Sequence, residues 1–262
     1  MLAFNQMGNL GRLGNQMFQY AAVRGISAMR GYQFGIPPFE SKRVDNYSLH
    51  RAFTLDSVKS SNLAVLDRGH APVVIEKHFE FDEELHRMCP NDVSLFGFFQ
   101  TEKYFKHIEK QIRKDFTFKD EIKDECDDLI KQFTNPIALH IRRGDFVWNN
   151  KNHPPLSLDY YKSALDLFES DREVIIFSDD TEWCKEQELF ADDRFAVAEG
   201  GDQFYDLCLM SMCDDFIIAN STFSWWGAWL GNRGKVVAPK NWFGEALSHD
   251  TKDLYCKGWE VL

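Results

Sequence analysis

The second half of the chain alternates between short apolar runs and longer amphipathic segments. The short runs predict strands, and the segments between them, whose apolar residues recur three and four positions apart, predict helices. Strands separated by helices of this size are typical of a parallel, doubly wound sheet. The predicted strands cover residues 137–141, 173–177, 195–197, 216–219 and 236–238, and the predicted helices cover 158–168, 181–189, 203–213 and 223–230.

The first half of the chain shows a less regular pattern of the same kind. An apolar strand over residues 1–6 is followed by a glycine-containing loop and by a helix with one apolar face, which Gly31 ends. Residues 39–77 mix short strands with loops. The remaining predicted elements are strands over residues 32–36 and 94–100, a helix capped by Thr101, and a charged helix over residues 118–133.

The dipeptide Asn135-Pro136 marks the predicted domain boundary, because the residue before a proline is disfavoured in a helix. We therefore expect a first domain over residues 1–135 and a second over residues 136–262, with a C-terminal tail that packs back on the first. A chain of 262 residues with 44% hydrophobic residues and 23 phenylalanines is large and apolar enough to build these cores.

The clearest chemical signal follows the first strand of the second domain. There the apolar run gives way to H-I-R-R-G-D, which places four polar side chains at the end of the strand: His140, Arg142, Arg143 and Asp145. Ligands of open α/β sheets bind beyond the carboxyl ends of the strands, and a guanidinium fork matches phosphate oxygens. A solvated basic turn, with Asp145 paired to an arginine, is the alternative for an isolated R-R-G-D. The position after a buried strand favours an anion receptor.

Two later strand ends carry further candidates. Asp179 and Asp180 can hold ribose hydroxyls or a base edge, or they can cap the helix that follows. Ser221 and Thr222, followed by Phe223, form either a phosphate cradle at a helix N-terminus or an ordinary N-cap. The three tryptophans of that helix, at positions 225, 226 and 229, are interpreted as packing residues.

A third candidate is the loop G-N-L-G-R-L-G-N-Q over residues 8–16. It lies at a strand-to-helix turn, where free backbone N–H groups and the helix dipole attract negative charge. Its three glycines permit a close approach to a ligand. The loop matches neither the P-loop pattern nor a dinucleotide-binding fingerprint, so a plain β-to-α turn is the alternative.

Charge and composition exclude several classes of function. The net charge of −11 and the pI near 5.2 argue against nucleic acid and an anionic membrane face as partners, so a phosphate site must be a local basic pocket. No apolar run approaches the ~20 residues that span a bilayer, and the N-terminus lacks the features of a signal peptide. We therefore expect no transmembrane segment and a cytoplasmic location, with contact to the inner membrane face that is peripheral at most.

Metal and redox chemistry also have no support in the sequence. The six cysteines are scattered and form no C-x-x-C pair, so we expect free thiols in or near the core. There is no D-x-D motif and no histidine pair at ligand spacing. We therefore expect no metal-binding residues.

Five stretches together resemble the bacterial α-1,2-fucosyltransferases of glycosyltransferase family 11. They are G-R-L-G-N-Q-M-F-Q-Y-A (residues 11–21), G-F-F-Q-T-E-K-Y-F (97–105), H-I-R-R-G-D-F (140–146), F-S-D-D (177–180) and N-S-T-F-S-W-W-G-A-W-L (220–230). The H-x-R-R-x-D pattern is shared with the wider group of α-1,2-, α-1,6- and protein O-fucosyltransferases. The stretches occur in the family's order and span most of the chain.

This resemblance implies an α/β fold of GT-B type, in which two Rossmann-like domains face a cleft. It also implies a metal-independent, inverting transfer of fucose from GDP-fucose to a glycan. The expected acceptor is the 2-hydroxyl of a terminal β-galactoside. No cofactor is expected, because GDP-fucose is itself the donor substrate.

Carried over residue by residue, the resemblance assigns the donor diphosphate to the two arginines of H-I-R-R-G-D. It likens the glycine-containing loop to one that approaches the reacting centre in protein O-fucosyltransferases. The implied donor-binding residues are Arg12, Gly14, Asn15, His140, Arg142, Arg143, Asp179, Asp180, Ser221, Thr222 and Phe223. The implied catalytic residues are Arg142, His140, Asp145 and Asn15.

Two alternatives stay open at this point. The first is a non-catalytic module that binds a GDP-sugar or a glycan, although such a module would usually have lost an arginine or the loop. The second is a fucosyltransferase with another acceptor, such as a protein hydroxyl. The group that takes the acceptor proton is also open, between His140, Asp145 and no protein base at all.

Overall fold

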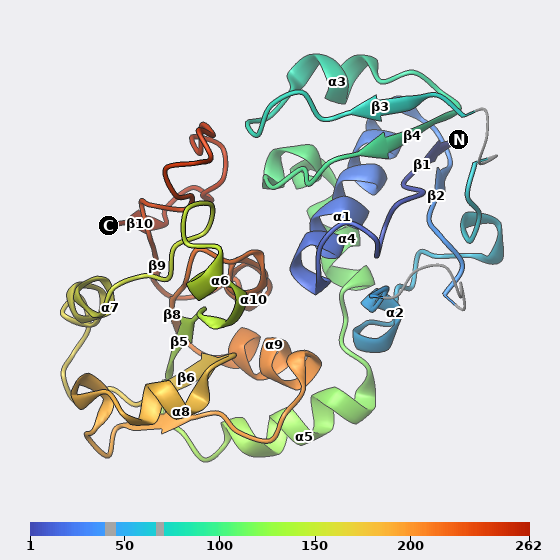
Figure 1. Ribbon diagram of the computed structural model, residues 1–262. Helices are drawn as coiled ribbons and strands as arrows, with labels where there is room; N and C mark the ends of the chain where they lie inside the picture. The colour runs from blue at the N-terminus through green and yellow to red at the C-terminus, as the bar shows by residue number, and fades with distance from the viewer. Residues whose placement is uncertain (40–45, 67–70) are drawn as a thin grey trace. The chain divides into compact units, whose positions relative to one another are not determined.

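The computed structural model describes residues 1–39, 46–66 and 71–262, and the chain divides into two compact units. The first comprises Met1–Lys119 and His249–Cys256, and the second comprises Asp120–Ser248 and Lys257–Leu262. Each unit contains a parallel β-sheet (Figure 1). Of the segment 39–77, for which short strands and loops are predicted, residues 40–45 and 67–70 lie outside the described residues.

The first unit is built on a short sheet with the strand order β2-β1-β4-β3, in which every pairing is parallel. The predicted strands near residues 1–6, 32–36 and 94–100 are confirmed in shortened form, and β3 lies in the segment 39–77, for which short strands are predicted; α2 and α3 are not predicted. The strands are β1 (Leu2–Ala3), β2 (Phe34–Gly35), β3 (Val73–Ile75) and β4 (Val93–Phe96). The helices are α1 (Leu13–Arg30), α2 (Leu49–Ala52), α3 (Glu83–Met88) and α4 (Glu109–Asp115), with 3-10 turns at Ser60–Asn62, Glu102–Tyr104 and Lys106–Ile108.

Helix α1 is the long central helix of this unit, and most of its residues up to Ser27 are buried. Gly31 ends it as predicted, because a residue with φ 69° and ψ 28° is left-handed and glycine adopts this conformation without strain. The predicted cap at Thr101 is present, since its side chain accepts a hydrogen bond from the Lys103 N–H. The element it begins is a 3-10 turn rather than an α-helix.

The carboxylate of Asp115 joins three segments of the first unit. Its side chain is fully buried, and it accepts hydrogen bonds from the Tyr20 hydroxyl at 2.9 Å, Arg24 Nε at 3.2 Å and the Ser57 backbone N–H at 2.8 Å. A buried charge is tolerated only while such partners satisfy it. Asp115 therefore fixes the end of α4 against α1.

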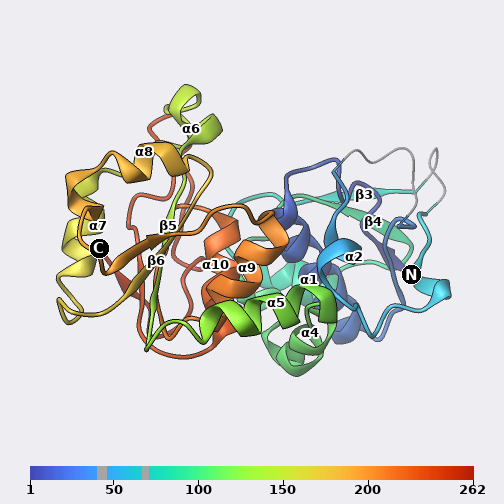
Figure 2. The same cartoon turned by 90° about the horizontal axis from the view of Figure 1, so that it is seen from below.

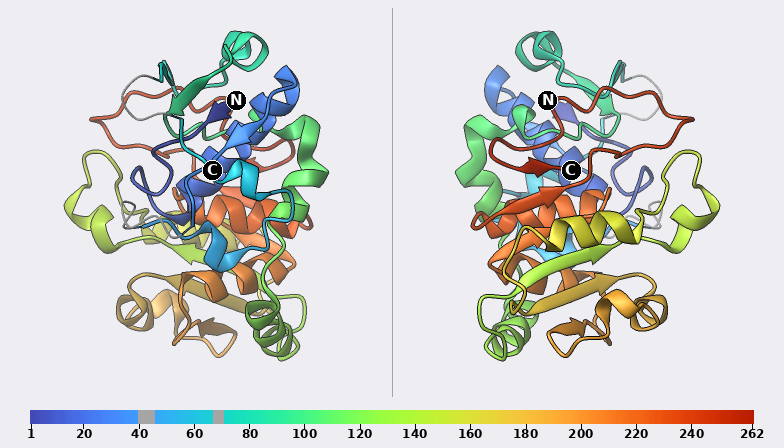
Figure 3. Two further views of the ribbon diagram at one scale, coloured as in Figure 1. Left: turned by 90° about the vertical axis from the view of Figure 1, so that its right-hand side faces the viewer. Right: turned by 90° about the vertical axis from the view of Figure 1, so that its left-hand side faces the viewer.

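The second unit contains a larger parallel sheet with the order β10-β9-β8-β5-β6-β7. The bounds of β5, β7 and β9 agree with the prediction, whereas α6 and β10 are not predicted; β10 pairs with β9 (Figure 3, right). The strands are β5 (Ile137–Ile141), β6 (Val174–Ser178), β7 (Phe195–Val197), β8 (Asp215–Ile217), β9 (Val236–Ala238) and β10 (Glu260–Val261). The helices are α5 (Asp120–Ile130), α6 (Gly144–Trp148), α7 (Leu158–Leu165), α8 (Thr181–Lys185), α9 (Gln203–Met212) and α10 (Thr222–Gly231), with a 3-10 turn at Glu188–Phe190.

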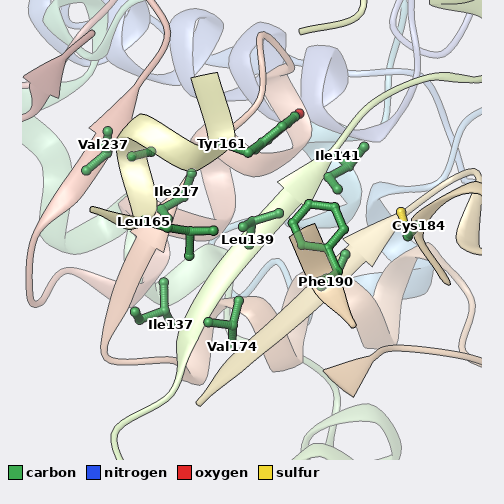
Figure 4. Close-up of a cluster of buried hydrophobic side chains, with 12 residues drawn as sticks. Ile137, Leu139, Ile141, Tyr161, Leu165, Val174, Cys184, Phe190, Ile217 and Val237 are labelled. Carbon is green, nitrogen blue, oxygen red and sulfur yellow. The ribbon is translucent and has the colours of Figure 1, made fainter. Parts of the chain in front are cut away.

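The central strand β5 separates two layers of the second unit. Figure 2 shows α7 and α8 on one side of the sheet and α9 and α10 on the other. The odd-numbered residues of β5 join α7 in one buried apolar cluster (Figure 4): Ile137, Leu139, Ile141, Tyr161 and Leu165. Side chains alternate between faces along a strand, so His140 lies on the opposite face, where its ring packs against Phe223 of α10 at 5.5 Å.

Helix α5 groups with the second unit, so the chain divides at residues 119 and 120 and not at the expected residues 135 and 136. The reason is packing: α5 lies against α9, and the Cys126 thiol donates to the Tyr205 carbonyl at 3.5 Å. Proline marks where a helix ends, but the apolar stripe of the helix decides which unit it joins. The tail segment His249–Cys256 groups with the first unit, where Asp253 accepts from the Phe81 N–H at 3.0 Å.

Two expectations about side chains in the core are confirmed. Trp225 and Trp226 are fully buried and Trp229 is nearly so, which agrees with their interpretation as packing residues. All six cysteines are free thiols, and only Cys256 is not fully within the core.

We predict that Asp115→Asn lowers the free energy of unfolding by about 3 kcal/mol, because the change leaves Arg24 without its carboxylate in a buried position. The matched control is Asp127→Asn on α5, whose partner Lys123 is exposed; this change should cost less than about 1 kcal/mol. Urea unfolding at neutral pH measures both values. Equal losses in the two variants would contradict the role given to Asp115.

Candidate functional site

The carboxyl ends of β5 and β8 form the switch point of the larger sheet. From β5 the chain continues to β6 and β7 on one side, and it then crosses to β8, β9 and β10 on the other. Ligands of open α/β sheets bind at such a point. The candidate residues of this unit lie in or just beyond three neighbouring strands, β5, β6 and β8: His140, Arg142, Arg143, Asp145, Asp179, Asp180, Ser221, Thr222 and Phe223.

Arg142 lies directly beyond β5, and two carboxylates hold its guanidinium. Nη2 is paired with Asp145, and Nη1 lies 2.8 Å from Oδ2 of Asp179. The arginine side chain is only 15% exposed, whereas that of Asp145 is 53% exposed. An incoming anion can therefore displace Asp145 more easily than Asp179, and the guanidinium is already aimed when it does so.

Arg143 is held in a different way. Its Nε donates to Oδ2 of Asp180 at 3.0 Å, and its guanidinium stacks on the ring of Trp183 at 3.9 Å from the centroid. Its backbone N–H donates to Asp179 Oδ1 at 2.8 Å. The aromatic platform fixes the plane of the guanidinium, and Trp183 is a residue that the sequence did not single out.

Asp180 and Ser221 also cap the helices that follow them. Asp180 accepts from the Trp183 N–H at 3.3 Å, and the Ser221 hydroxyl accepts from the Phe223 N–H at 3.3 Å. The N-cap interpretation is therefore confirmed for both residues. Capping leaves the positive end of the α10 dipole at the carboxyl end of β8, where it favours negative charge.

His140 is buried at the centre of this group, with 5% of its surface exposed. Its Nδ1 finds no hydrogen-bond partner among the described residues. Burial, helped by the positive charge of Arg142, lowers the pKa of His140 to about 3. The imidazole is therefore neutral near pH 7.

The remaining candidates belong to the first unit. Arg12 is the exposed N-cap residue of α1 and contributes no side-chain cap, while Gly14 and Asn15 lie in the first turn of the helix. Gly11 has φ 85°, and a Cβ at this position would lie 2.3 Å from Asn15 Nδ2. Glycine is therefore required here, because the Asn15 amide occupies the space a side chain would need.

Three buried glutamines support this loop, and none of them is among the site residues expected from the sequence. Gln16 Oε1 accepts from the Ser48 N–H at 2.9 Å, and Gln19 Nε2 donates to the Leu10 carbonyl at 2.8 Å. Gln100 Nε2 donates to the Asn15 side chain at 3.0 Å. The signal in the sequence is a polar amide inside an otherwise apolar run, as in G-F-F-Q.

Metal ligands and membrane spans are both absent from the described ranges. No three histidine, cysteine, aspartate or glutamate side chains converge as they would around a metal ion in residues 1–39, 46–66 and 71–262. Within the same ranges, no helix combines the length and the apolar character needed to cross a bilayer.

Comparison with known proteins agrees with the motifs. The model of a family described as glycosyl transferase family 11 matches residues 3–262. An α-1,2-colitosyltransferase of Escherichia coli is 34% identical over 89% of this chain and 90% of its own length. The O-antigen biosynthesis glycosyltransferase WbnK of Escherichia coli is 30% identical, with coverages of 94% and 97%. The human galactoside α-(1,2)-fucosyltransferase 1 is 27% identical over 86% of this chain and 65% of its own length.

Two solved structures of fucosyltransferases share this fold. The structure of the α-1,6-fucosyltransferase NodZ soaked with GDP-fucose has a TM-score of 0.53 at 12% identity, covering 87% of this chain and 91% of the other. POFUT1 in complex with GDP has a TM-score of 0.52 at 14% identity, with coverages of 88% and 94%. Identities this low speak for the fold alone, and the predicted GT-B class is confirmed at that level.

We predict that His140 makes the protein less stable as the pH falls below about 6.5. The folded state holds the imidazole neutral, so unfolding takes up a proton wherever the free imidazole is charged, down to the folded pKa of about 3. Between pH 7 and pH 5 this amounts to about 2 kcal/mol of unfolding free energy. Urea unfolding of the wild type and of His140→Leu at pH 7 and pH 5 isolates the contribution of His140 to the unfolding free energy, because the variant lacks the imidazole. An equal pH dependence in the two proteins would contradict the buried neutral imidazole.

Proposed function

Because the chain belongs to glycosyl transferase family 11, we propose that it transfers fucose from GDP-fucose to the 2-hydroxyl of a terminal β-galactoside, with inversion and without a metal ion. The observation that carries the proposal is the placement of a carboxylate-held arginine and a helix N-terminus on neighbouring strands at the switch point of one sheet. Both features stabilise negative charge.

The proposed role of Arg142 is to bind the diphosphate of the donor. Breaking the bond between sugar and GDP leaves charge on a phosphate oxygen while the sugar becomes oxocarbenium-like. A guanidinium already oriented by Asp179 stabilises that charge without reorganising, and one such donor is worth roughly 3–4 kcal/mol of barrier. In this scheme Asp145, the exposed partner, yields its place on Arg142 to the phosphate.

The acceptor hydroxyl loses its proton late or to a group other than His140. Burial lowers the pKa of His140 to about 3, so its imidazole is neutral at pH 7 but is a weak base in the free protein. Asp145 is engaged with Arg142 in the free protein, and it becomes available only when phosphate replaces it. His140 packs against Phe223 with only 5% of its surface exposed, whereas the Asp145 side chain is 53% exposed, so we keep Asp145 as the candidate proton acceptor on grounds of access.

A second donor is favoured by one specific comparison. The 34% identical relative is named an α-1,2-colitosyltransferase, and colitose is fucose without its 3-hydroxyl. The two sugars differ by a single polar group, and a pocket that hydrogen-bonds this hydroxyl rejects the sugar that lacks it. The preference between GDP-fucose and GDP-colitose is thus a property of a few contacts and not of the fold.

One assay separates these possibilities. The protein is incubated with GDP-fucose or GDP-colitose, alone and with a β-galactoside, its 2-deoxy analogue or a folded protein acceptor. Sugar transfer to the β-galactoside and none to the 2-deoxy analogue supports the proposal. Release of GDP with protein glycosylation indicates another acceptor. Tight binding of the donor with no turnover under any condition indicates a binding module.

We predict that Arg142→Ala removes nearly all transfer and that Arg142→Lys keeps less than a tenth of the rate, a loss above ~1.4 kcal/mol. A lysine is a point charge and cannot replace the bidentate fork. The matched control is Arg172→Lys, since Arg172 is paired with Asp215 at the opposite edge of the same sheet. Initial rates beside a thermal melt show the difference. A near wild-type rate in Arg142→Lys would contradict the proposal that Arg142 binds the diphosphate of the donor.

We also predict that transfer continues at its full rate in excess EDTA. In this scheme a guanidinium and a helix dipole stabilise the negative charge on the leaving phosphate, so the reaction does not need a divalent ion for that purpose. Rates with EDTA, Mn²⁺ and Mg²⁺ provide the check. Activity that disappears in EDTA and returns with either ion would overturn this expectation.

A further inference from the structure

Trp148 lies at the end of α6, the short helix that follows the two arginines of the candidate site, and it is 90% exposed. All seven tryptophans of the chain lie within the described ranges, and the other six are buried or partly buried. An indole that stays in water contributes little to the stability of the fold. The packing of the second unit therefore does not explain this side chain.

The place of Trp148 on α6 puts it beside a charged group of the candidate site. Asp145 is three residues earlier in the same helix, and residues three apart are neighbours on a helix surface. The helical turn is formed, since the Asn149 N–H donates to the Asp145 carbonyl at 3.0 Å. The carboxylate of Asp145 is in turn paired with Arg142, a further three residues back. The indole therefore adjoins the carboxylate that is the candidate proton acceptor.

The backbone that carries Trp148 is held by aromatic contacts on its inner side. The Arg142 guanidinium lies 5.2 Å from the centroid of the Phe146 ring, and this ring stacks on that of His153 at 5.1 Å. The His153 N–H donates to the Asn149 carbonyl at 2.9 Å, which closes the turn after α6. Figure 2 shows α6 at the margin of the second unit, beyond the end of β5.

The loop after α6 is also fastened to a later segment of the same unit. The Gly244 N–H donates to the Asn152 carbonyl at 2.8 Å, and the Ala246 N–H donates to the Lys151 carbonyl at 2.9 Å. A Cβ at Gly244 would lie 2.3 Å from the Lys151 carbonyl oxygen, so the two segments are in direct contact. The backbone of the exposed indole is thus already ordered, and a ligand that binds to it need not order the loop.

An exposed indole on an ordered backbone, next to a carboxylate, suits a sugar ring. The axial 4-hydroxyl of a galactopyranose points to one face of the ring and leaves a patch of C–H bonds on the other. Aromatic side chains cover such an apolar face, while a few polar groups bind the hydroxyls at its edge. A lipid surface is the other partner that an exposed indole suits, but the net charge of −11 disfavours an anionic membrane.

We propose that Trp148 is the platform on which the ring of the acceptor sugar stacks, so that the reacting hydroxyl lies near Asp145. The inference rests on the proposed function, and it names a residue that binds the acceptor and not the donor. Arg142, Asp145 and Trp148, spaced by three residues, then serve the donor phosphate, the hydroxyl proton and the acceptor ring in that order.

The first test measures the kinetics of transfer to a soluble β-galactoside in variants of position 148. We expect the KM for the β-galactoside to rise about tenfold in Trp148→Ala, with an unchanged thermal melt because the residue is exposed. Trp148→Phe should recover most of the affinity, whereas Trp148→Leu, which is apolar but has no flat face, should not. The matched control is Leu129→Ala, an exposed apolar position on α5, which should keep the wild-type KM.

A second measurement does not depend on turnover. Iodide quenches the fluorescence of indoles that it can reach, so Trp148 should supply most of the quenchable emission, and Trp148→Phe should lose it. In the presence of GDP, methyl β-galactoside should protect the wild-type protein from iodide, whereas glycerol at the same concentration should not. Quenching that the galactoside leaves unchanged, together with a wild-type KM in Trp148→Ala, would overturn the inference.

The two measurements keep the inference separate from the proposed function. If the wild type transfers no sugar to a β-galactoside, the proposed function fails, while protection of Trp148 by methyl β-galactoside still supports a sugar platform. If the wild type is active and Trp148→Ala keeps its acceptor KM, only the inference fails. Trp148→Ala that loses binding to vesicles of phosphatidylcholine and phosphatidylglycerol, with an unchanged acceptor KM, would mark a membrane contact and overturn the inference.

Discussion

Arg142 and Arg143 are adjacent and lie close to the buried imidazole of His140, so their positive charge must be balanced by carboxylates. The candidate site of the second unit depends on these ion pairs. Asp179 and Asp180 come from the neighbouring strand β6, and Asp145 comes from the turn after β5 itself. Since β5 and β6 pair in parallel register up to Ser178, these side chains arrive at one edge without any further adjustment. Burial, and to a smaller extent the charge of Arg142, keeps His140 neutral, while the ion pairs balance the charge of the two arginines.

At the corresponding edge of the smaller sheet in the first unit, the loops are held by buried amide side chains and by the Glu76 carboxylate, which accepts from the Phe98 N–H at 2.7 Å. Amide side chains, each with one donor and one acceptor end, hold the loop after β1 against the loop after β4.

Much of this arrangement could be predicted from the sequence. The spacing of apolar residues predicts the bounds of β5, β7 and β9 to the residue. Buried parallel strands appear in the sequence as short apolar runs, and the helices between them have one apolar face. The polar residues at the strand ends followed from the general position of ligands in such sheets. The allocation of α5 could not be predicted, since its partner α9 lies about 80 residues away and no local signal points to it.

Which side chains pair with one another could also not be predicted from the sequence. The sequence allowed two roles for Asp180, ligand binding and helix capping. In the structure its carboxylate caps α8 and also accepts from Arg143, because one carboxylate can accept hydrogen bonds from both donors. Trp183 under Arg143 and Gln100 beside Asn15 depend on contacts between segments that are distant in the chain or turned towards each other only after folding. Gln100 lies within a stretch that the sequence singles out, but its partner Asn15 becomes known only from the fold.

The central claim is that the edge formed by β5, β6 and β8 binds a nucleoside diphosphate through Arg142. Calorimetric titration of GDP, GMP and guanosine into the wild-type protein at moderate salt tests it most directly. The account predicts that GDP binds at least tenfold more tightly than GMP, a difference of about 1.4 kcal/mol or more, because the guanidinium and the α10 dipole act on the second phosphate. Equal affinities for GDP, GMP and guanosine would contradict it, since the phosphates would then contribute nothing to binding.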